Sequence, residues 1–104
     1  MDRGIEILGT KQGLTARKTV VTINFRCLAP QAKTVFLVGD FNDWQPQATP
    51  LRRHVDGSWS IHVALNHGNY RYQFLVDGRP TLDPRAHGVT RNEQNERVSL
   101  ICVS

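Results

Sequence analysis

Residues 58–78, SWSIHVALNHGNYRYQFLVDG, decide the fold class, because apolar and polar side chains alternate along most of the stretch. In a β-strand every second side chain lies on the same face, so this alternation is typical of half-buried strands. It predicts strands over residues 59–65 and 70–76, with a turn at residues 67–69. Asp77-Gly78, which follows, is typical of a tight hairpin turn.

The same period extends through most of the chain. One face of residues 19–27 would carry Val21, Ile23, Phe25 and Cys27. Residues 34–39 form a short apolar run of β-branched and aromatic side chains, which is typical of a central strand. Further strands are predicted over residues 51–55 and 97–103, and polar loops over residues 39–50 and 79–96.

No stretch has a helical period, and about seven short strands separated by turns predict an all-β protein, an antiparallel β-sandwich. A chain of 104 residues has room for one hydrophobic core. We therefore expect one sandwich domain over residues 19–104. Residues 1–18 show no clear period and are predicted to be an N-terminal arm, with room for one short edge strand.

Charge and hydropathy argue against two classes of partner. The net charge is +4, from 13 Lys and Arg against 9 Asp and Glu, but the basic residues are scattered and interleaved with acidic ones. A nucleic-acid surface needs a basic stripe, so no nucleic-acid partner is expected. The apolar runs are too short to span a membrane, and the N-terminus lacks the features of a secretory signal. We expect a cytoplasmic protein with no membrane partner.

Residues that could support redox, metal or catalytic chemistry are few. Cys27 and Cys102 are each predicted in a strand, which favours small core residues, with a disulfide between the first and last strands as the alternative. The histidines lack metal-ligand spacing, so neither a metal nor a cofactor is expected. Four carboxylates could supply the acid pair of a glycosidase, but loop and turn roles explain them better. These are Asp40, Asp43, Asp77 and Asp83.

The run from Val38 to Trp44, VGDFNDW, resembles the loop signature of family-48 carbohydrate-binding modules. These include the glycogen-binding domain of the AMP-activated protein kinase beta subunit and the N-terminal domains of isoamylases and glycogen branching enzymes. Residues 72–78 followed by Asp83-Pro84, and residues 95–98, resemble two further segments of the family in the same order. The resemblance implies an immunoglobulin-like early-set sandwich that binds an α-glucan.

The resemblance also implies which residues would hold the sugar. A glucose unit has a flat apolar face and a rim of hydroxyls, so a binder needs an aromatic platform and hydrogen-bonding side chains. The family places the platform at Trp44; the alternative is a tryptophan that plugs the end of the sandwich. Trp59, by contrast, shares a face with apolar residues of its strand and is expected in the core.

Other family contacts carry over unevenly. A polar strand position falls on Gln73, and a late-loop contact falls on Arg97 or, with a shift of two residues, on Asn95. The family's second tryptophan falls on Pro80, so one platform is expected in place of two, with Arg79 as a neighbour that could project across the same surface. The alternative for each of the four candidate contacts is a solvated surface residue.

The function expected from the sequence is non-catalytic binding of an α-glucan, such as glycogen or a maltooligosaccharide. The alternative is a protein-interaction or scaffolding domain, associated with glucan-metabolising enzymes, that has lost most of its sugar affinity. A third reading combines both roles beside a separately encoded glucan-processing enzyme. A hydrolase has the least support, because a small sandwich offers no deep cleft between two carboxylates.

Overall fold

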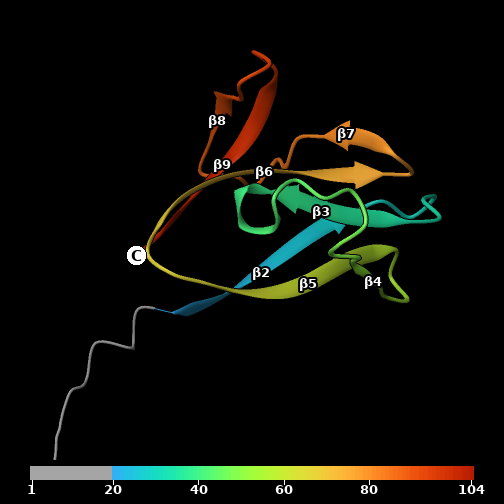
Figure 1. The fold of residues 1–104 in the computed structure, drawn as a ribbon. Helices are drawn as coiled ribbons and strands as arrows, with labels where there is room; N and C mark the ends of the chain where they lie inside the picture. Colours follow the sequence, from blue (N-terminus) through green and yellow to red (C-terminus); the bar gives the residue numbers. More distant parts are fainter. Residues whose placement is uncertain (1–19) are drawn as a thin grey trace, which may run out of the picture.

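The computed structural model describes residues 20–104, so the predicted arm over residues 1–18 lies outside the described residues. Two antiparallel sheets pack against each other, and the predicted all-β sandwich is confirmed (Figure 1). The first sheet has the order β2-β5-β4, and its strands are β2 (Val21–Leu28), β4 (Arg52–Arg53) and β5 (Ser58–Leu65). No helix among the described residues is long and apolar enough to cross a membrane.

The second sheet has the order β3-β6-β9-β8, with β7 paired to β6 beside this path. Its strands are β3 (Val35–Gly39), β6 (Gly68–Val76), β7 (Arg79–Thr81), β8 (Gly88–Arg91) and β9 (Arg97–Val103). Strands β5 and β6 follow each other in the sequence but lie in different sheets, so the turn between them carries the chain from one layer to the other (Figure 1).

The core lies between the inner faces of the two sheets, where the alternating apolar side chains meet. Phe74 of β6 is 0% exposed and Trp59 of β5 is 6% exposed. The rings of Phe25 in β2 and Tyr72 in β6 meet edge to face at 5.0 Å between centroids. The predicted inward faces of the main strands are thus confirmed, including Trp59 as a core residue.

The predicted hairpin turn at Asp77-Gly78 is present. Asp77 and Gly78 have φ angles of 50° and 82° and join β6 to β7 with two residues, as a tight hairpin turn of left-handed residues requires. The Asp77 carboxylate also accepts hydrogen bonds from the backbone N–H groups of Lys33 and Thr34, at 2.8 and 2.9 Å. Asp77 therefore has a structural role, and it ties this hairpin to the segment before β3.

Several details of the sequence-based prediction were wrong. The strand predicted over residues 51–55 is present only as β4, which has two residues. β3 is an edge strand, not a central one; its edge is covered by residues 49–51, because Leu37 N–H donates to the Thr49 carbonyl and Leu51 N–H to the Val35 carbonyl. The loop predicted over residues 79–96 contains the short strands β7 and β8, which have too few residues to show a period. Cys102 is exposed rather than in the core, because its side chain faces outward from β9.

Candidate functional site

The site is built on a tight turn that follows β3, and Gly39 allows the start of this turn to lie close against β6. A methyl group at Gly39 would lie 2.7 Å from the Arg71 carbonyl oxygen and 2.8 Å from the Tyr72 Cβ. Atoms cannot approach so closely without displacing the backbone, so only glycine lets the end of β3 lie against β6 here.

Phe41 and Asn42 hold the turn in place, Phe41 by packing on aromatic rings and Asn42 by hydrogen bonds within the turn. The Phe41 ring packs against Phe25 and Tyr70, with centroids 5.6 and 6.0 Å away. Asn42 accepts a hydrogen bond from Gly39 N–H at 3.0 Å through Oδ1, and through Nδ2 it donates to the Leu37 carbonyl at 2.9 Å. The same Nδ2 donates to Thr49 Oγ1 at 3.0 Å, which closes the loop after the turn.

Asp40 connects this turn to β6 and to Trp44. Its Oδ2 accepts hydrogen bonds from Arg71 N–H at 2.8 Å and from Arg71 Nε at 3.3 Å, and its Oδ1 accepts one from Trp44 Nε1 at 3.0 Å. Burial raises the pKa of Asp40, but the hydrogen bonds from Arg71 and Trp44 and the Arg71 charge outweigh it and lower the pKa below its usual range. Asp40 is therefore a carboxylate that orients the indole.

Trp44 stands in an unusual backbone conformation. Asp43 and Trp44 have φ angles of 57° and 56°, in the left-handed region that favours glycine, and Trp44 N–H donates to the Gly39 carbonyl at 3.0 Å. For a bulky side chain this conformation costs of order 1–3 kcal/mol, and such outliers concentrate at functional sites. The side chain is half-buried and lies against a hollow at the protein surface.

The hollow has a volume of about 440 Å³ and is mostly polar. It lies between the turn after β3, the outward face of β6 and the loop between β8 and β9. Its lining residues are Asp40, Asp43, Trp44, Arg71, Gln73, Asn92, Glu93, Gln94 and Glu96. One aromatic ring beside several hydrogen-bonding side chains is an arrangement that suits a neutral polyhydroxylated ligand.

Asn92 shapes the loop that forms the far wall of the hollow. Its Oδ1 accepts hydrogen bonds from the backbone N–H groups of Gln94 and Glu96 at 3.0 and 2.9 Å, and its Nδ2 donates to Glu96 Oε1 at 3.0 Å. Arg91 Nη1 donates to the carbonyl of Asn95, which has a φ of 63°. The loop is therefore held by its own side chains.

The structure brings two of the five predicted contact residues together. Trp44 and Gln73 line the same hollow. Arg79 lines a separate hollow of about 330 Å³ with Val76, Asp77 and Thr81, while Asn95 and Arg97 adjoin the far wall without being among the lining residues. Pro80 pairs with Leu75 in the β6–β7 hairpin.

Sequence reasoning missed Arg71 and Asn92. Arg71 lies two residues before Gln73 and so shares its face of β6, a signal that the alternation already contained. Asn92 gave no comparable signal, because its place opposite Trp44 depends on the pairing of β9 with both β6 and β8. Long-range pairing of this kind is not visible in a local pattern.

Asp83 lies outside this site and has a structural role. It is 9% exposed and accepts hydrogen bonds from Tyr72 Oη at 2.6 Å and Arg85 N–H at 2.9 Å, while its own N–H donates to Ser99 Oγ at 2.8 Å. Burial and the hydrogen bond to Asp83 raise the pKa of Tyr72 above its usual value. Asp83 thus holds the segment after β7 against the core.

Two further sequence expectations can be compared with the described residues. Cys27 and Cys102 are free cysteines, so the alternative of a disulfide between them is not realised. Within residues 20–104, no group of three or more His, Cys, Asp or Glu side chains is placed to hold a metal ion.

Comparison with known proteins gives one family match and several relatives. The family described as carbohydrate-binding module 48 (isoamylase N-terminal domain) matches residues 11–99. The 1,4-alpha-glucan branching enzyme GlgB of Lactobacillus acidophilus is 43% identical over 67 residues, which cover 60% of this chain and 10% of the enzyme. The GlgB 1 enzyme of Clostridium perfringens strain 13 is 27% identical over 85 residues, which cover 77% of this chain and 13% of the enzyme. The chain thus matches only about a tenth of the length of these relatives.

Proposed function

Because the chain belongs to carbohydrate-binding module family 48, the isoamylase N-terminal domain family, we propose that it binds an α-glucan in the hollow beside Trp44 without cutting it. The ligand would be glycogen or a maltooligosaccharide. The observation that carries the proposal is the strained Trp44, whose indole is fixed against the hollow by the Asp40 carboxylate.

The chemistry of the hollow supports this ligand class. An indole face matches the C–H face of a glucose ring, and Gln73, Arg71 and Asn92 are polar side chains from two other elements around the same hollow. Arg71 carries a charge, but Asp40 already pairs with it at 3.3 Å. The other charged lining residues are the carboxylates of Asp43, Glu93 and Glu96, which can accept hydrogen bonds from sugar hydroxyls and disfavour an anionic ligand.

The affinity is expected to be weak to moderate. With Pro80 at the position of the family's second tryptophan, one aromatic platform and a few hydrogen bonds must offset the freedom that sugar and side chains lose on binding. A non-catalytic role fits three of the four candidate carboxylates, because Asp40, Asp77 and Asp83 are occupied by hydrogen bonds within the protein, which leaves Asp43 in the hollow without a partner for a glycosidase acid pair among these four. Release of reducing sugar from glycogen would contradict this part of the proposal.

The first experiment is a titration with maltoheptaose followed by intrinsic tryptophan fluorescence. The wild type is compared with Trp44→Ala, which leaves Trp59 as the fluorophore, and with Trp59→Phe, which leaves Trp44. We expect saturable changes in the wild type and in Trp59→Phe, and none in Trp44→Ala. Absence of any change in folded wild type at millimolar sugar would overturn the proposal.

The second candidate function is a protein-interaction domain associated with glucan-metabolising enzymes. Pro80 favours it, because a module that has lost a stacking platform can keep the sandwich for another use. Pull-down from a cell extract with and without added maltoheptaose separates the two. Partners retained irrespective of sugar, in a protein that fails the titration, would favour the interaction role.

A further inference from the structure

The sheet edges of the described residues differ in how they are protected against pairing with another strand. The edge of β3 is covered by residues 49–51, and β4 is two residues long, both arginine. β7 has three residues with Pro80 in the middle, and β8 has four residues and ends in Arg91. Short length, charge and proline are the usual ways in which proteins discourage edge-to-edge pairing.

Among residues 20–104, nothing protects the edge of β2 in these ways. Within residues 20–104 it pairs only with β5, in a continuous register of eight residues without a bulge. It contains no proline, and its one charged residue, Arg26, is 3.3 Å from Asp56. Val20, just before β2, and Leu28, at its end, are 53% and 74% exposed. A long, partly apolar edge with one charge that is already paired is a template for another strand.

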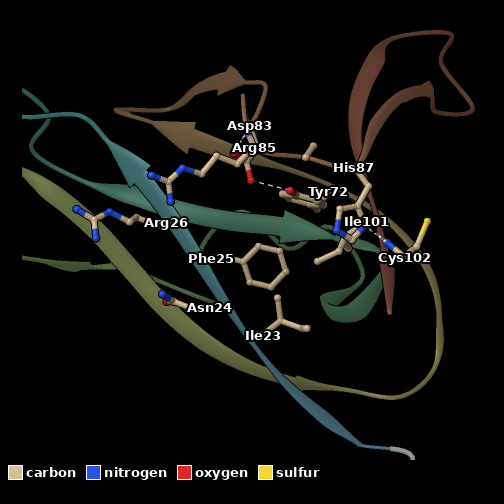
Figure 2. A pocket seen from close by; sticks show the side chains of 11 residues that line it. Ile23, Asn24, Phe25, Arg26, Tyr72, Asp83, Arg85, His87, Ile101 and Cys102 are labelled. Carbon is tan, nitrogen blue, oxygen red and sulfur yellow. Dashed lines mark hydrogen bonds between the residues drawn. The ribbon is translucent and has the colours of Figure 1, made fainter. Parts of the chain in front are cut away.

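Two hollows run along this edge. One of about 290 Å³ is lined by the consecutive residues 23–26, and one of about 540 Å³ by residues 26–28. Consecutive residues of a strand point to opposite faces, so hollows lined by all of them follow the edge itself. Figure 2 shows Asn24 and Arg26 on one side of β2, Ile23 and Phe25 on the other, and Arg85 and Ile101 across the gap.

We propose that β2 pairs antiparallel with β2 of a second copy of this chain, with the two-fold axis at Asn24. A second copy fits this edge because β2 is complementary to itself in this register. With Asn24 opposite Asn24 of the other copy, every residue from 20 to 28 has a partner. The exposed Val20 of one copy then faces the exposed Leu28 of the other, at both ends of the interface. On the inner face Ile23 faces Phe25, so apolar groups meet there too.

Other registers are less favourable. A shift by one residue would place outward side chains opposite inward ones. A register centred on Arg26 would bring two like charges directly opposite each other and leave both copies of Val20 uncovered. The register centred on Asn24 is the one that pairs the apolar ends and separates the two arginines.

The strand pairing would not use the Trp44 hollow, since none of its lining residues belongs to β2. If the proposed function also holds, one dimer presents two sugar sites to a polymer with many chain ends. Binding at the second site then becomes intramolecular, which raises the apparent affinity for glycogen above that for a short maltooligosaccharide. The dimer itself rests only on the β2 edge.

The test is sedimentation velocity of the full chain without sugar, over a range of concentrations. We expect a concentration-dependent dimer. Asn24→Lys places two ammonium groups face to face at the axis and should raise the dimer dissociation constant at least about tenfold. His62→Lys is the matched control, because His62 pairs with Asn24 on β5, away from the free edge, and should leave dimerisation nearly unchanged.

A cross-link gives a second readout. Asn24→Cys in a Cys102→Ser background should form a covalent dimer on oxidation, since opposite residues in an antiparallel pair have Cα atoms about 4.5–5.5 Å apart, which suits a disulfide. His62→Cys in the same background should not. A chain that stays monomeric at high concentration and does not cross-link overturns the proposal, and β2 amides protected from hydrogen exchange in that monomer would show that something other than a second copy covers the edge.

Discussion

The two tryptophans lie in regions that use the same side chain in opposite ways. Trp59 belongs to a regular strand, is 6% exposed, and donates its indole N–H to the Ala29 carbonyl at 3.0 Å. Trp44 belongs to a turn, has a left-handed backbone, and donates its indole N–H to the Asp40 carboxylate. Burial fixes the first side chain, whereas hydrogen bonds and a strained turn fix the second at a surface hollow.

The difference shows that one tryptophan contributes to the stability of this sandwich and the other to the proposed binding site. The Trp59 ring contributes its apolar area to the core, and the Arg53 guanidinium lies 5.8 Å above it. The Trp44 ring keeps a partly exposed face at the cost of backbone strain. Substitutions of Trp59 should therefore act on unfolding, and substitutions around Trp44 on ligand binding.

The largest expected effect is that of Trp59→Ala on stability. It removes a buried ring and leaves the Ala29 carbonyl without its indole donor, so the free energy of unfolding should fall by about 3–5 kcal/mol. Urea denaturation monitored by circular dichroism measures it. Trp59→Phe, which retains most of the buried area, serves as the control and should lose less than half as much. An alanine variant as stable as the wild type would break the comparison.

The next effect concerns the carboxylate behind Trp44. Asp40→Asn replaces an acceptor of several N–H groups by an amide that offers only one oxygen, so its own N–H₂ group must face a donor. We expect about 1–2 kcal/mol less stability and maltoheptaose binding weakened at least about fivefold, because the indole is held less firmly.

Asp43→Asn is the matched control for Asp40→Asn. Asp43 lines the same hollow, and asparagine tolerates its left-handed φ of 57°. Stability and sugar affinity should both change little. Equal losses in the two variants would show that the charge of the hollow matters rather than the hydrogen bond to Trp44.

The sequence predicted much of this comparison, because its signals are local. Alternation placed Trp59 in the core, and the motif from Gly39 to Trp44 marked the turn, where each residue now has a physical reason. Gly39 allows the close approach to β6, Phe41 packs on the core, and Asn42 closes the loop.

What could not be predicted depends on pairing between distant segments. The far wall of the hollow, formed by Asn92, Glu93, Gln94 and Glu96, lies opposite Trp44 only because β9 pairs with both β6 and β8. β7 and β8 are too short for a period to appear. The apolar run of β3 was predicted to be a central strand. In the structure β3 is an edge strand, but residues 49–51 cover its outer edge, where a central strand would have a neighbouring strand.

A smaller effect is expected from the backbone strain at Trp44. It can be measured separately from the loss of the indole by comparing two variants that both lack the ring. At a φ of 56° glycine carries no penalty, whereas alanine does. Trp44→Gly should therefore be more stable than Trp44→Ala by about 1 kcal/mol, although glycine normally destabilises relative to alanine. Both should lose sugar binding alike. If alanine were the more stable variant, the turn would not be strained at this residue.

The smallest effect is the dependence of stability on pH through Asp40. Its pKa in the folded protein is lowered from the ordinary value of 3.8, so its contribution is fully present above that value and is lost as the pH falls through the lowered pKa. Asp40→Asn lacks this contribution at every pH. The difference in urea midpoint between wild type and Asp40→Asn should therefore be constant near neutral pH and narrow below about pH 4.

Asp56 and Asp77, whose pKa values are also lowered by hydrogen bonds, are present in both proteins, so their titration cancels in the difference. The narrowing should be small, because solvent screens a carboxylate that is not fully buried. A difference that stays constant down to pH 2 would mean that the contribution of Asp40 through its hydrogen bonds to Arg71 and Trp44 does not depend on its charge.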